Sequence, residues 1–301
     1  FRSIFLEGFG RPRGGVRQIL SPLLERFRGL GGELRLKTAV RRLIVRDRQI
    51  EAVLLDDGSE LRAKQVLSSA GWPETLKLCD EAQETAGEWN AEGNGGGAKP
   101  ETGSVRTPDS MAGELAFTES IAVLDQPPEK LGITDTVTFF SHTPVFHYEP
   151  ADCTVDLRSG VICCPDNYHY DKPLDVSMVR ITSLAGYDAW NRLSAAEYRL
   201  EKGLCFRQVT EAVTVGSEWG NGLIPDFRSH VVDTDLFTPR TVRRFTGRIH
   251  GAIYGAPEKR YDGRTHLKNL FLCGTDQGMV GIIGTLISGI MMANRYCLET
   301  S

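Results

Sequence analysis

The sequence predicts a mixed α/β (α+β) fold in which an antiparallel sheet is inserted into a domain built from both ends of the chain. Near the end, an apolar run over 270–273 stops at Gly274, and a glycine-rich loop leads to an apolar helical run from Gly281. Near the start, one helical pattern precedes short runs of alternating polar and apolar residues. Between the two lie several β-rich runs separated by Pro, Asp and Gly turns.

Composition limits the classes of partner. A chain of 301 residues with 41% hydrophobic residues can bury a sizeable core, and its length predicts about two domains. The net charge of −4 gives none of the basic surface that nucleic-acid binding needs, so no nucleic-acid partner is expected. The seven cysteines are odd in number and lack framework spacing, which predicts free thiols in a reducing compartment and hence a cytoplasmic protein.

Neither end of the chain suggests a membrane-targeting segment. The first eight residues lack the basic and apolar regions of a signal peptide, so we expect an internal start. The longest apolar stretch, 279–292, is shorter than a bilayer span and contains three glycines, so no membrane-spanning helix is predicted.

The elements follow in order from local signals. Helical spacing predicts a helix over 16–28, and alternation predicts strands over 32–38, 40–45 and 50–55, with a hairpin turn at 56–58. A further strand over 61–69 ends at Ala70 and Gly71. The stretch 80–113 is rich in Glu, Gly, Ala, Asn and Pro, which predicts a mobile surface insertion.

The central part predicts a sheet followed by helices. The β-rich runs cover 115–124, 136–140, 154–163 and 176–184. Ser194 and Glu197 form a capping-box pattern, and Thr238 with Pro239 opens a second helix. The helix that Ser194 caps has its apolar residues at these positions: Tyr198, Leu200, Leu204, Val209 and Val213.

The glycine-rich segment after residue 273 has the properties of a nucleotide-cofactor site. Glycines let the backbone approach a ligand closely, and a helix N-terminus near Gly281 offers unpaired N–H groups to an anion or an electron-rich ring. Glycines also serve tight helix packing, and this alternative stays open from spacing alone.

Four segments together carry a resemblance to the flavin-dependent phytoene desaturase, carotenoid isomerase and retinol saturase family, within the amine-oxidase-like flavoproteins. They lie at 11–28, 31–43, 54–71 and 269–298, and the regions around 187–202, 237–241 and 251–255 also resemble the second half of that family. The resemblance implies a partial FAD-binding Rossmann-like domain from 1–78 and 245–301, and an antiparallel-sheet substrate domain from 79–244.

The resemblance also implies a cofactor and its contacts. Val40 resembles the residue beside the adenine of FAD, and Ala70 and Gly71 end a strand beside the nucleotide. The C-terminal motif supplies the remaining contacts implied near the ribityl chain, the pyrophosphate and the flavin ring: Gly274, Thr275, Asp276, Gly281, Ile282 and Ile283. A helix start near the ring can stabilise negative charge on reduced flavin.

One departure from the family is large. Its members begin with a glycine-rich dinucleotide fingerprint, and no segment of this chain fits it. The chain therefore resembles the C-terminal portion of such a protein. Either the N-terminal half is absent from this sequence, or a separate FAD-binding polypeptide supplies it as a partner.

The function implied is an FAD-dependent oxidoreductase that desaturates, saturates or isomerises an apolar polyene or isoprenoid-like substrate, with possible peripheral contact to a membrane. No catalytic side chain is predicted, because the flavin carries the chemistry. Large residues of the sheet are candidates for an apolar tunnel or for plain core: Phe139, Phe140, Val145, Phe146 and Tyr148. The His and Cys spacings match no metal site.

Three alternatives stay open. The same scaffold serves amine-oxidase-like and protoporphyrinogen-oxidase-like flavoenzymes. The Rab GDP-dissociation inhibitors share it too, and they bind a prenylated protein without flavin chemistry. A truncated fragment without function is the third alternative.

Overall fold

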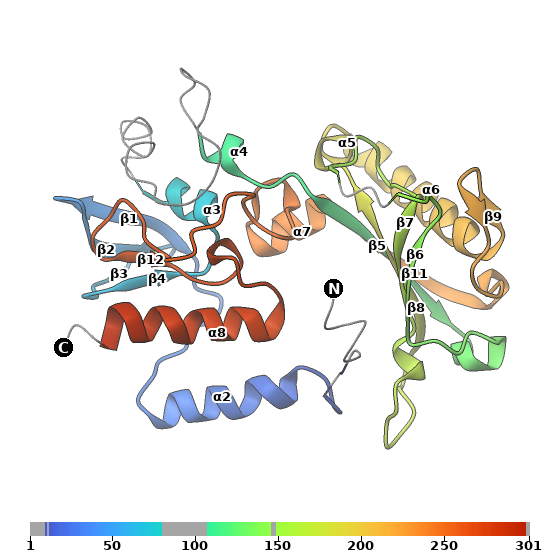
Figure 1. Cartoon of the computed structure of the whole chain (residues 1–301), viewed down its shortest axis with the longest axis horizontal. Coiled ribbons are helices and arrows are strands. Elements are labelled where there is room, and N and C mark those ends of the chain that lie inside the picture. The colour runs from blue at the N-terminus through green and yellow to red at the C-terminus, as the bar shows by residue number, and fades with distance from the viewer. Residues whose placement is uncertain (1–9, 11, 80–106, 146–148, 299–301) are drawn as a thin grey trace.

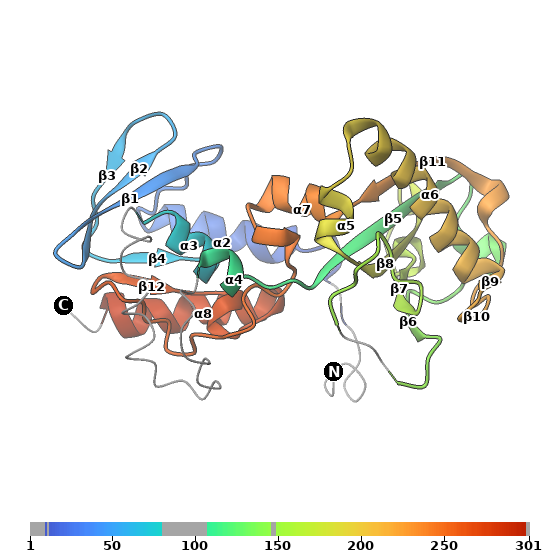
Figure 2. The same cartoon turned by 90° about the horizontal axis from the view of Figure 1, so that it is seen from above.

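A computed structural model of the chain describes residues 10, 12–79, 107–145 and 149–298, and it has two lobes (Figures 1 and 2). One lobe contains both ends of the described chain, and the other contains a five-stranded sheet. The helices α5 (Tyr187–Asn191) and α7 (Pro239–Thr246) lie where the lobes meet. The predicted mixed α/β class is confirmed.

The first lobe is organised around two parallel strands, β4 (Val66–Ser68) and β12 (Leu270–Leu272). Alternate side chains of these strands enter different apolar clusters, because successive residues of a strand face opposite ways. Phe271 packs with Met292 and Tyr296 beneath α8 (Gly281–Ala293) and the π-helical turn η7 (Asn294–Leu298). Leu270 packs on the other face.

An antiparallel meander covers that other face. Its strands are β1 (Val40–Arg46), β2 (Gln49–Leu55) and β3 (Glu60–Leu61), and the predicted turn at 56–58 joins the last two. Leu43 and Ile50 of the meander are buried against Leu270. The short helix α3 (Trp72–Lys77) follows β4 and packs with α4 (Pro108–Met111), through Leu76 and Met111.

The second lobe is a sheet of order β11-β5-β8-β7-β6, with every pair of neighbours antiparallel. Its strands are β5 (Ala116–Leu124), β6 (Val137–Ser141), β7 (Ser159–Cys163), β8 (Ser177–Ala185) and β11 (Val231–Phe237). The 20-residue helix α6 (Ala195–Thr214) covers one face (Figure 1). Val209 and Val213 of α6 are buried with Val179 and Ile181 of β8.

The remaining elements are short. They are β9 (Gly216–Ser217), β10 (Gly220–Asn221), and the 3₁₀ turns η2 (Pro128–Leu131), η3 (Pro165–Asn167), η4 (Arg228–His230), η5 (Ile249–Gly251) and η6 (Thr275–Gln277). Of the predicted insertion at 80–113, residues 80–106 lie outside the described residues. The part from Thr107 onward forms α4, with Met111 buried.

Several predictions of individual elements are wrong. Residues 32–38 form no strand, and Leu36 there is 73% exposed. The strand β11 was not predicted, and only the second half of 154–163 is a strand. Leu200 and Leu204 of α6 are exposed instead of buried, so the buried stripe of α6 is narrower than its apolar pattern indicates.

The C-terminal helix is longer than the sequence suggests. In the described residues, one stretch, Gly281–Leu298, has the length of 18 residues and the apolar composition that a bilayer span requires. It is longer than the predicted 279–292 because η7 continues α8 without a break. Met292 and Tyr296 of this stretch pack against Phe271, so it also forms one wall of the first lobe.

Candidate functional site

The ends of β4 and β12 come together at one edge of the parallel pair, as the carboxyl ends of parallel strands must. After β4 the chain turns at Gly71, where φ is +113°, and α3 begins. After β12 it turns at Gly274, where φ is +83°, and enters η6. The N–H of Cys273 donates to the carbonyl of Ser68 at 2.9 Å, which aligns the two turns.

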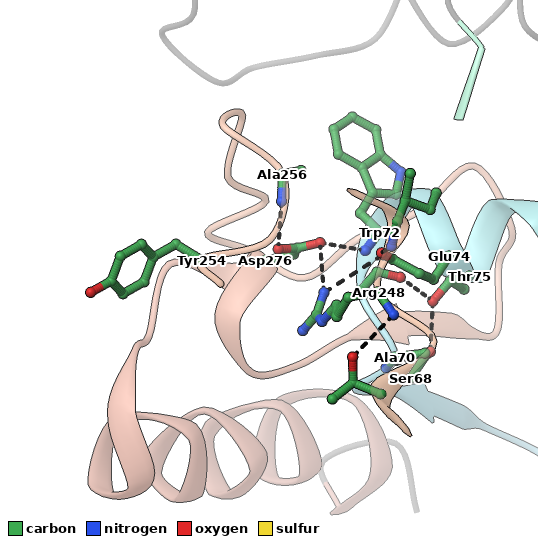
Figure 3. Close-up of polar contacts among 12 residues, drawn as sticks. Ser68, Ala70, Trp72, Glu74, Thr75, Arg248, Tyr254, Ala256 and Asp276 are labelled. Carbon is green, nitrogen blue, oxygen red and sulfur yellow. Dashed lines mark hydrogen bonds and ion pairs between the residues drawn. The ribbon is translucent and has the colours of Figure 1, made fainter. Parts of the chain in front are cut away.

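Asp276 joins the two turns from inside the protein. Its side chain is 1% exposed, and Oδ2 accepts the N–H of Trp72 at 2.5 Å while Oδ1 accepts the N–H of Ala256 at 3.0 Å (Figure 3). Arg248 and Lys259 place cationic nitrogens 3.7 and 3.8 Å from the carboxylate. Asp276 therefore holds three segments together, and its oxygens are directed at protein groups.

Glu74 extends this network at the start of α3. Its Oε1 accepts the N–H of Ile249 at 2.8 Å, and its Oε2 lies 3.6 Å from Nη1 of Arg248. Burial raises the pKa of Glu74, and the Ile249 N–H and Arg248 act in the opposite direction. Burial also lowers the pKa of Lys259, although Asp276 opposes this shift.

A second buried link fixes the loop between β12 and α8. Ser288 of α8 is fully buried, and its hydroxyl accepts the N–H of Gly274 and donates to Oε1 of Gln277, both at 2.5 Å. Gln277 in turn donates to the carbonyl of Tyr261 at 2.8 Å. A hydroxyl in the middle of an apolar helix therefore positions the glycine turn.

The start of α8 is open. Gly281 has φ of +74°, and a Cβ built on it meets no atom within 4 Å. Val280, which precedes the helix, gives no side-chain cap, and Ile282 and Ile283 are half exposed. Free N–H groups beside half-exposed apolar side chains fit the ring and linker of a flavin dinucleotide. Gly281, Ile282 and Ile283 would hold it there, with Gly274 and Thr275 nearby on the loop.

The other predicted site residues divide into two groups. Ala70 and Gly71 follow β4 and directly precede Trp72, whose N–H donates to Asp276 of the C-terminal motif. Gly71 is packed tightly, because a Cβ there would lie 2.1 Å from Nη1 of Arg248 and 2.2 Å from Oε2 of Glu74. Val40 lies at the start of β1 in the meander and is exposed. All nine residues remain predictions as cofactor contacts.

The sequence did not indicate Glu74 or Ser288. It offered Arg248, with Arg240, Arg243 and Arg244, as a contact for an anionic cofactor or membrane headgroups or as part of a solvated face, whereas Arg248 is 15% exposed and lies beside Glu74 and Asp276. A polar residue at position 288 inside an otherwise apolar helical run is a signal that could have identified Ser288. Glu74 carries no such signal, because it meets Ile249 and Arg248 only through tertiary contacts.

The sheet of the second lobe has one face that α6 does not cover. Along β5, Ala116, Thr118 and Ser120 are buried, whereas Phe117 and Ile121, on the opposite face, are half buried. On the edge strand β6, Phe139 lies on the less buried face and is 48% exposed. Phe140 packs against the core instead. Phe146 and Tyr148 lie outside the described residues.

This uncovered face carries apolar side chains together with charged ones, because Asp233 and Asp235 of β11 pair with Val123 and Ile121. The cross-strand partners of Ile121 and Val123 are Arg180 and Met178, and Val161 pairs with Phe139. Glu119, the single acid of β5, forms an ion pair with Arg180. Figure 1 shows α6 on one side of the sheet and the lobe with α8 on the other side.

The cysteines and histidines that the structure describes form no second site. None of the seven cysteines forms a disulfide, and burial raises the pKa of Cys164 and of Cys205 to about 12. Such thiols are poor nucleophiles. Within the described ranges, no three His, Cys, Asp or Glu residues are placed to hold a metal ion.

The chain is similar in sequence to plant carotenoid isomerases. No family model matches it. It is 22% identical to the chloroplastic prolycopene isomerase of Daucus carota over 306 residues, which covers 97% of this chain and 45% of that protein. It is 24% identical to the Arabidopsis thaliana prolycopene isomerase, with 97% and 46% covered. The chain thus spans about half the length of these relatives.

Solved structures share the fold. An oxidoreductase from Methanosarcina mazei matches with a TM-score of 0.58 at 14% identity, over 97% of this chain and 57% of that one. A putrescine oxidase variant matches with a TM-score of 0.53 at 14% identity, over 95% and 53%. Along nearly the whole chain the sequence is similar to prolycopene isomerases, and the fold is similar to that of the oxidoreductase structure.

Proposed function

We propose that this chain is the flavin-ring and substrate portion of an FAD-dependent oxidoreductase that desaturates, saturates or isomerises an apolar polyene or isoprenoid-like substrate. The open start of α8 at Gly281, at the end of the loop that Ser288 fixes, supports this proposal most directly. Bound FAD would supply the exchange of a hydride with the substrate.

The residues of the chain would bind and orient. The free N–H groups at Gly281 would stabilise negative charge on the ring, and the Asp276 network would hold the two strand ends in place. The uncovered face of the five-stranded sheet would shield an apolar substrate from water through Phe117, Phe139 and Ile121.

Charge on that face favours an apolar substrate over an amine. A cationic amine needs a free carboxylate or an aromatic cage. Glu119 forms an ion pair with Arg180, and Asp235 of the neighbouring strand β11 forms one with Lys202, so both carboxylates already have a cationic partner. The likeness to putrescine oxidase therefore supports the shared fold and does not extend to an amine substrate.

The test is an absorption spectrum of the purified protein after incubation with FAD and gel filtration. The protein is examined alone and co-expressed with the half of the carrot prolycopene isomerase that lies outside the matched region. Flavin bands followed by conversion of a cis-carotene to another isomer or to a product of altered saturation, measured by chromatography, would support the proposal. Absence of bound flavin in both preparations would overturn it in favour of a non-catalytic binding module. The cytoplasmic location also remains a prediction, since the named relatives are chloroplastic.

A further inference from the structure

The helix α2 (Arg17–Gly29) has an apolar stripe that no described residue buries. Leu20, Leu23, Leu24 and Phe27 recur three or four residues apart on one face, with exposed fractions between 37% and 48%. None of the 13 residues of α2 is buried. A helix of this length is marginally stable in water without packing, so the stripe needs a partner.

The segment that follows α2 also lacks a partner. Residues 32–38 alternate polar and apolar side chains as a strand does, yet they pair with no described strand. Leu34 and Leu36 are both exposed. An alternating segment becomes a strand only when a neighbour accepts and donates its backbone hydrogen bonds.

The parallel pair has an open edge on β4. In the described ranges β4 pairs only with β12. The N–H of Val66 and the carbonyl of Ser68 bond toward the β12 side, so the peptide groups of Leu67 between them point to the other edge. Parallel sheets are rarely this small, because they need several strands with both faces covered.

The outward face of α8 is apolar as well. Only 17% of the stretch Gly281–Leu298 is buried, and Ile287 and Ile290 are exposed. Figure 1 shows α2 and α8 along the same side of the molecule. The α2 stripe, residues 32–38, the β4 edge and this face of α8 together form what we call the uncovered surface.

We propose that the uncovered surface is the docking site of a complementary polypeptide, equivalent to the half of the prolycopene isomerases outside the matched region. That polypeptide would add a strand parallel to β4 and would cover α2 and α8. The chain matches 45% of the carrot protein, so a segment of comparable size is available in each relative to fill this surface. This polypeptide would also complete the proposed cofactor site, but the argument for docking does not require that flavin is bound.

The β4 edge decides between a polypeptide and a membrane as occupant. Backbone N–H and C=O groups at a sheet edge require hydrogen-bonding partners, which lipid tails do not offer. An added strand supplies them directly. A lipid surface would satisfy the α2 stripe alone and would leave Leu67 and residues 32–38 without partners.

The test co-expresses this chain with the unmatched half of the prolycopene isomerase from carrot, from Arabidopsis and from Oncidium, each in turn. We expect a one-to-one complex with at least one of them. Hydrogen–deuterium exchange should slow by about tenfold or more at the amide of Leu67 and within α2. The double variant L23E/F27E should lose the complex while its urea midpoint is unchanged, because neither side chain is buried. L200E on α6 is the control, at a position that is more exposed than Leu23 and Phe27 and lies outside the surface, and it should bind normally.

Other outcomes overturn the proposal. The first is that no complex forms with any of the three halves. The second is that a complex forms but hydrogen exchange at Leu67 and in α2 does not slow. Binding of the chain to phosphatidylcholine–phosphatidylglycerol vesicles that is lost in L23E/F27E would assign the surface to a membrane. A homodimer lost in the same variant would assign it to a second copy. If a complex forms and slows hydrogen exchange at Leu67 and in α2 but binds no flavin, only the proposed function is contradicted. If the chain binds flavin without forming a complex, only the docking site is contradicted.

Discussion

The backbone N–H of Trp72 donates a hydrogen bond of 2.5 Å to Oδ2 of Asp276, although 204 residues separate the two along the chain. The other carboxylate oxygen accepts the N–H of Ala256 at 3.0 Å. One buried side chain therefore fixes the first turn of α3 to the turn after β12. The geometry of the candidate site depends on this link.

Replacing Asp276 with alanine should lower the free energy of unfolding by about 3 kcal/mol, because it leaves two buried N–H groups and two nearby cations without their acceptor. Urea unfolding followed by circular dichroism measures the change. The control D152A, at an exposed position, should stay within about 0.5 kcal/mol of the parent protein. Equal losses in both variants would contradict a structural role for Asp276.

Replacing Ser288 with alanine should cost about 1–2 kcal/mol of stability and speed the hydrogen exchange of the Gly274 amide, because that N–H loses its acceptor. The control T285A lies on the same helix, where its hydroxyl bonds only carbonyls of α8 itself. It should leave the Gly274 amide unchanged. Unaltered exchange at Gly274 in S288A would show that the hydroxyl does not hold the loop.

The substitutions G281A and G247A distinguish the effect of backbone strain from the loss of a flavin contact. Both glycines have φ near +74°, and a Cβ on either meets no atom within 4 Å, so each should cost about 1 kcal/mol of stability. Only G281A should weaken FAD binding, because Gly247 caps α7 away from the helix start. A flavin titration of the assembled protein measures the difference. Equal loss of flavin in both variants would rule out a contact at Gly281.

His266 should make stability depend on pH. Burial, with a smaller effect of Arg48, lowers the pKa of its imidazole to about 4 from 6.5. The unfolded chain therefore binds the proton more readily, so the contribution is full above pH 6.5 and is lost as the pH falls toward 4. H266Q should flatten the curve of unfolding free energy over this window. Parallel curves for the two proteins between pH 7 and 4 would refute the shift.

Phe139 and Phe140 are neighbours with opposite roles. F140A should lower stability by about 2–3 kcal/mol, because Phe140 packs against the core of the second lobe. F139A should change stability by less than about 1 kcal/mol but should weaken binding of a polyene, which fluorescence quenching measures. Unchanged polyene binding in F139A would remove the uncovered face of the sheet from the substrate site.

Local signals in the sequence predicted much of this fold correctly. Ser194 and Glu197 form the expected capping box, Thr238 accepts the N–H of Thr241 at the start of α7, and α8 begins at Gly281. Each of these signals acts within a few residues, so it can be read without knowing the rest of the structure.

Features that depend on distant partners could not be predicted in this way. The strand β11 contains two aspartates and is mostly exposed, and its pairing with β5 is what makes it a strand. Leu200 is apolar but 70% exposed, because α6 presents other residues to the sheet. Aspartate is a residue type that usually lies at the surface. Asp276 is buried because its carboxylate accepts the N–H groups of Trp72 and Ala256.

The pairing of β4 with β12 affects the order in which the chain folds during synthesis. β4 emerges from the ribosome early, and the strand that pairs with it follows roughly two hundred residues later, at about 5–20 residues per second. The five strands of the inserted sheet lie between them and are complete first. The nascent chain therefore carries an unpaired apolar strand for about ten seconds or longer, an interval in which a chaperone or a waiting partner can bind it.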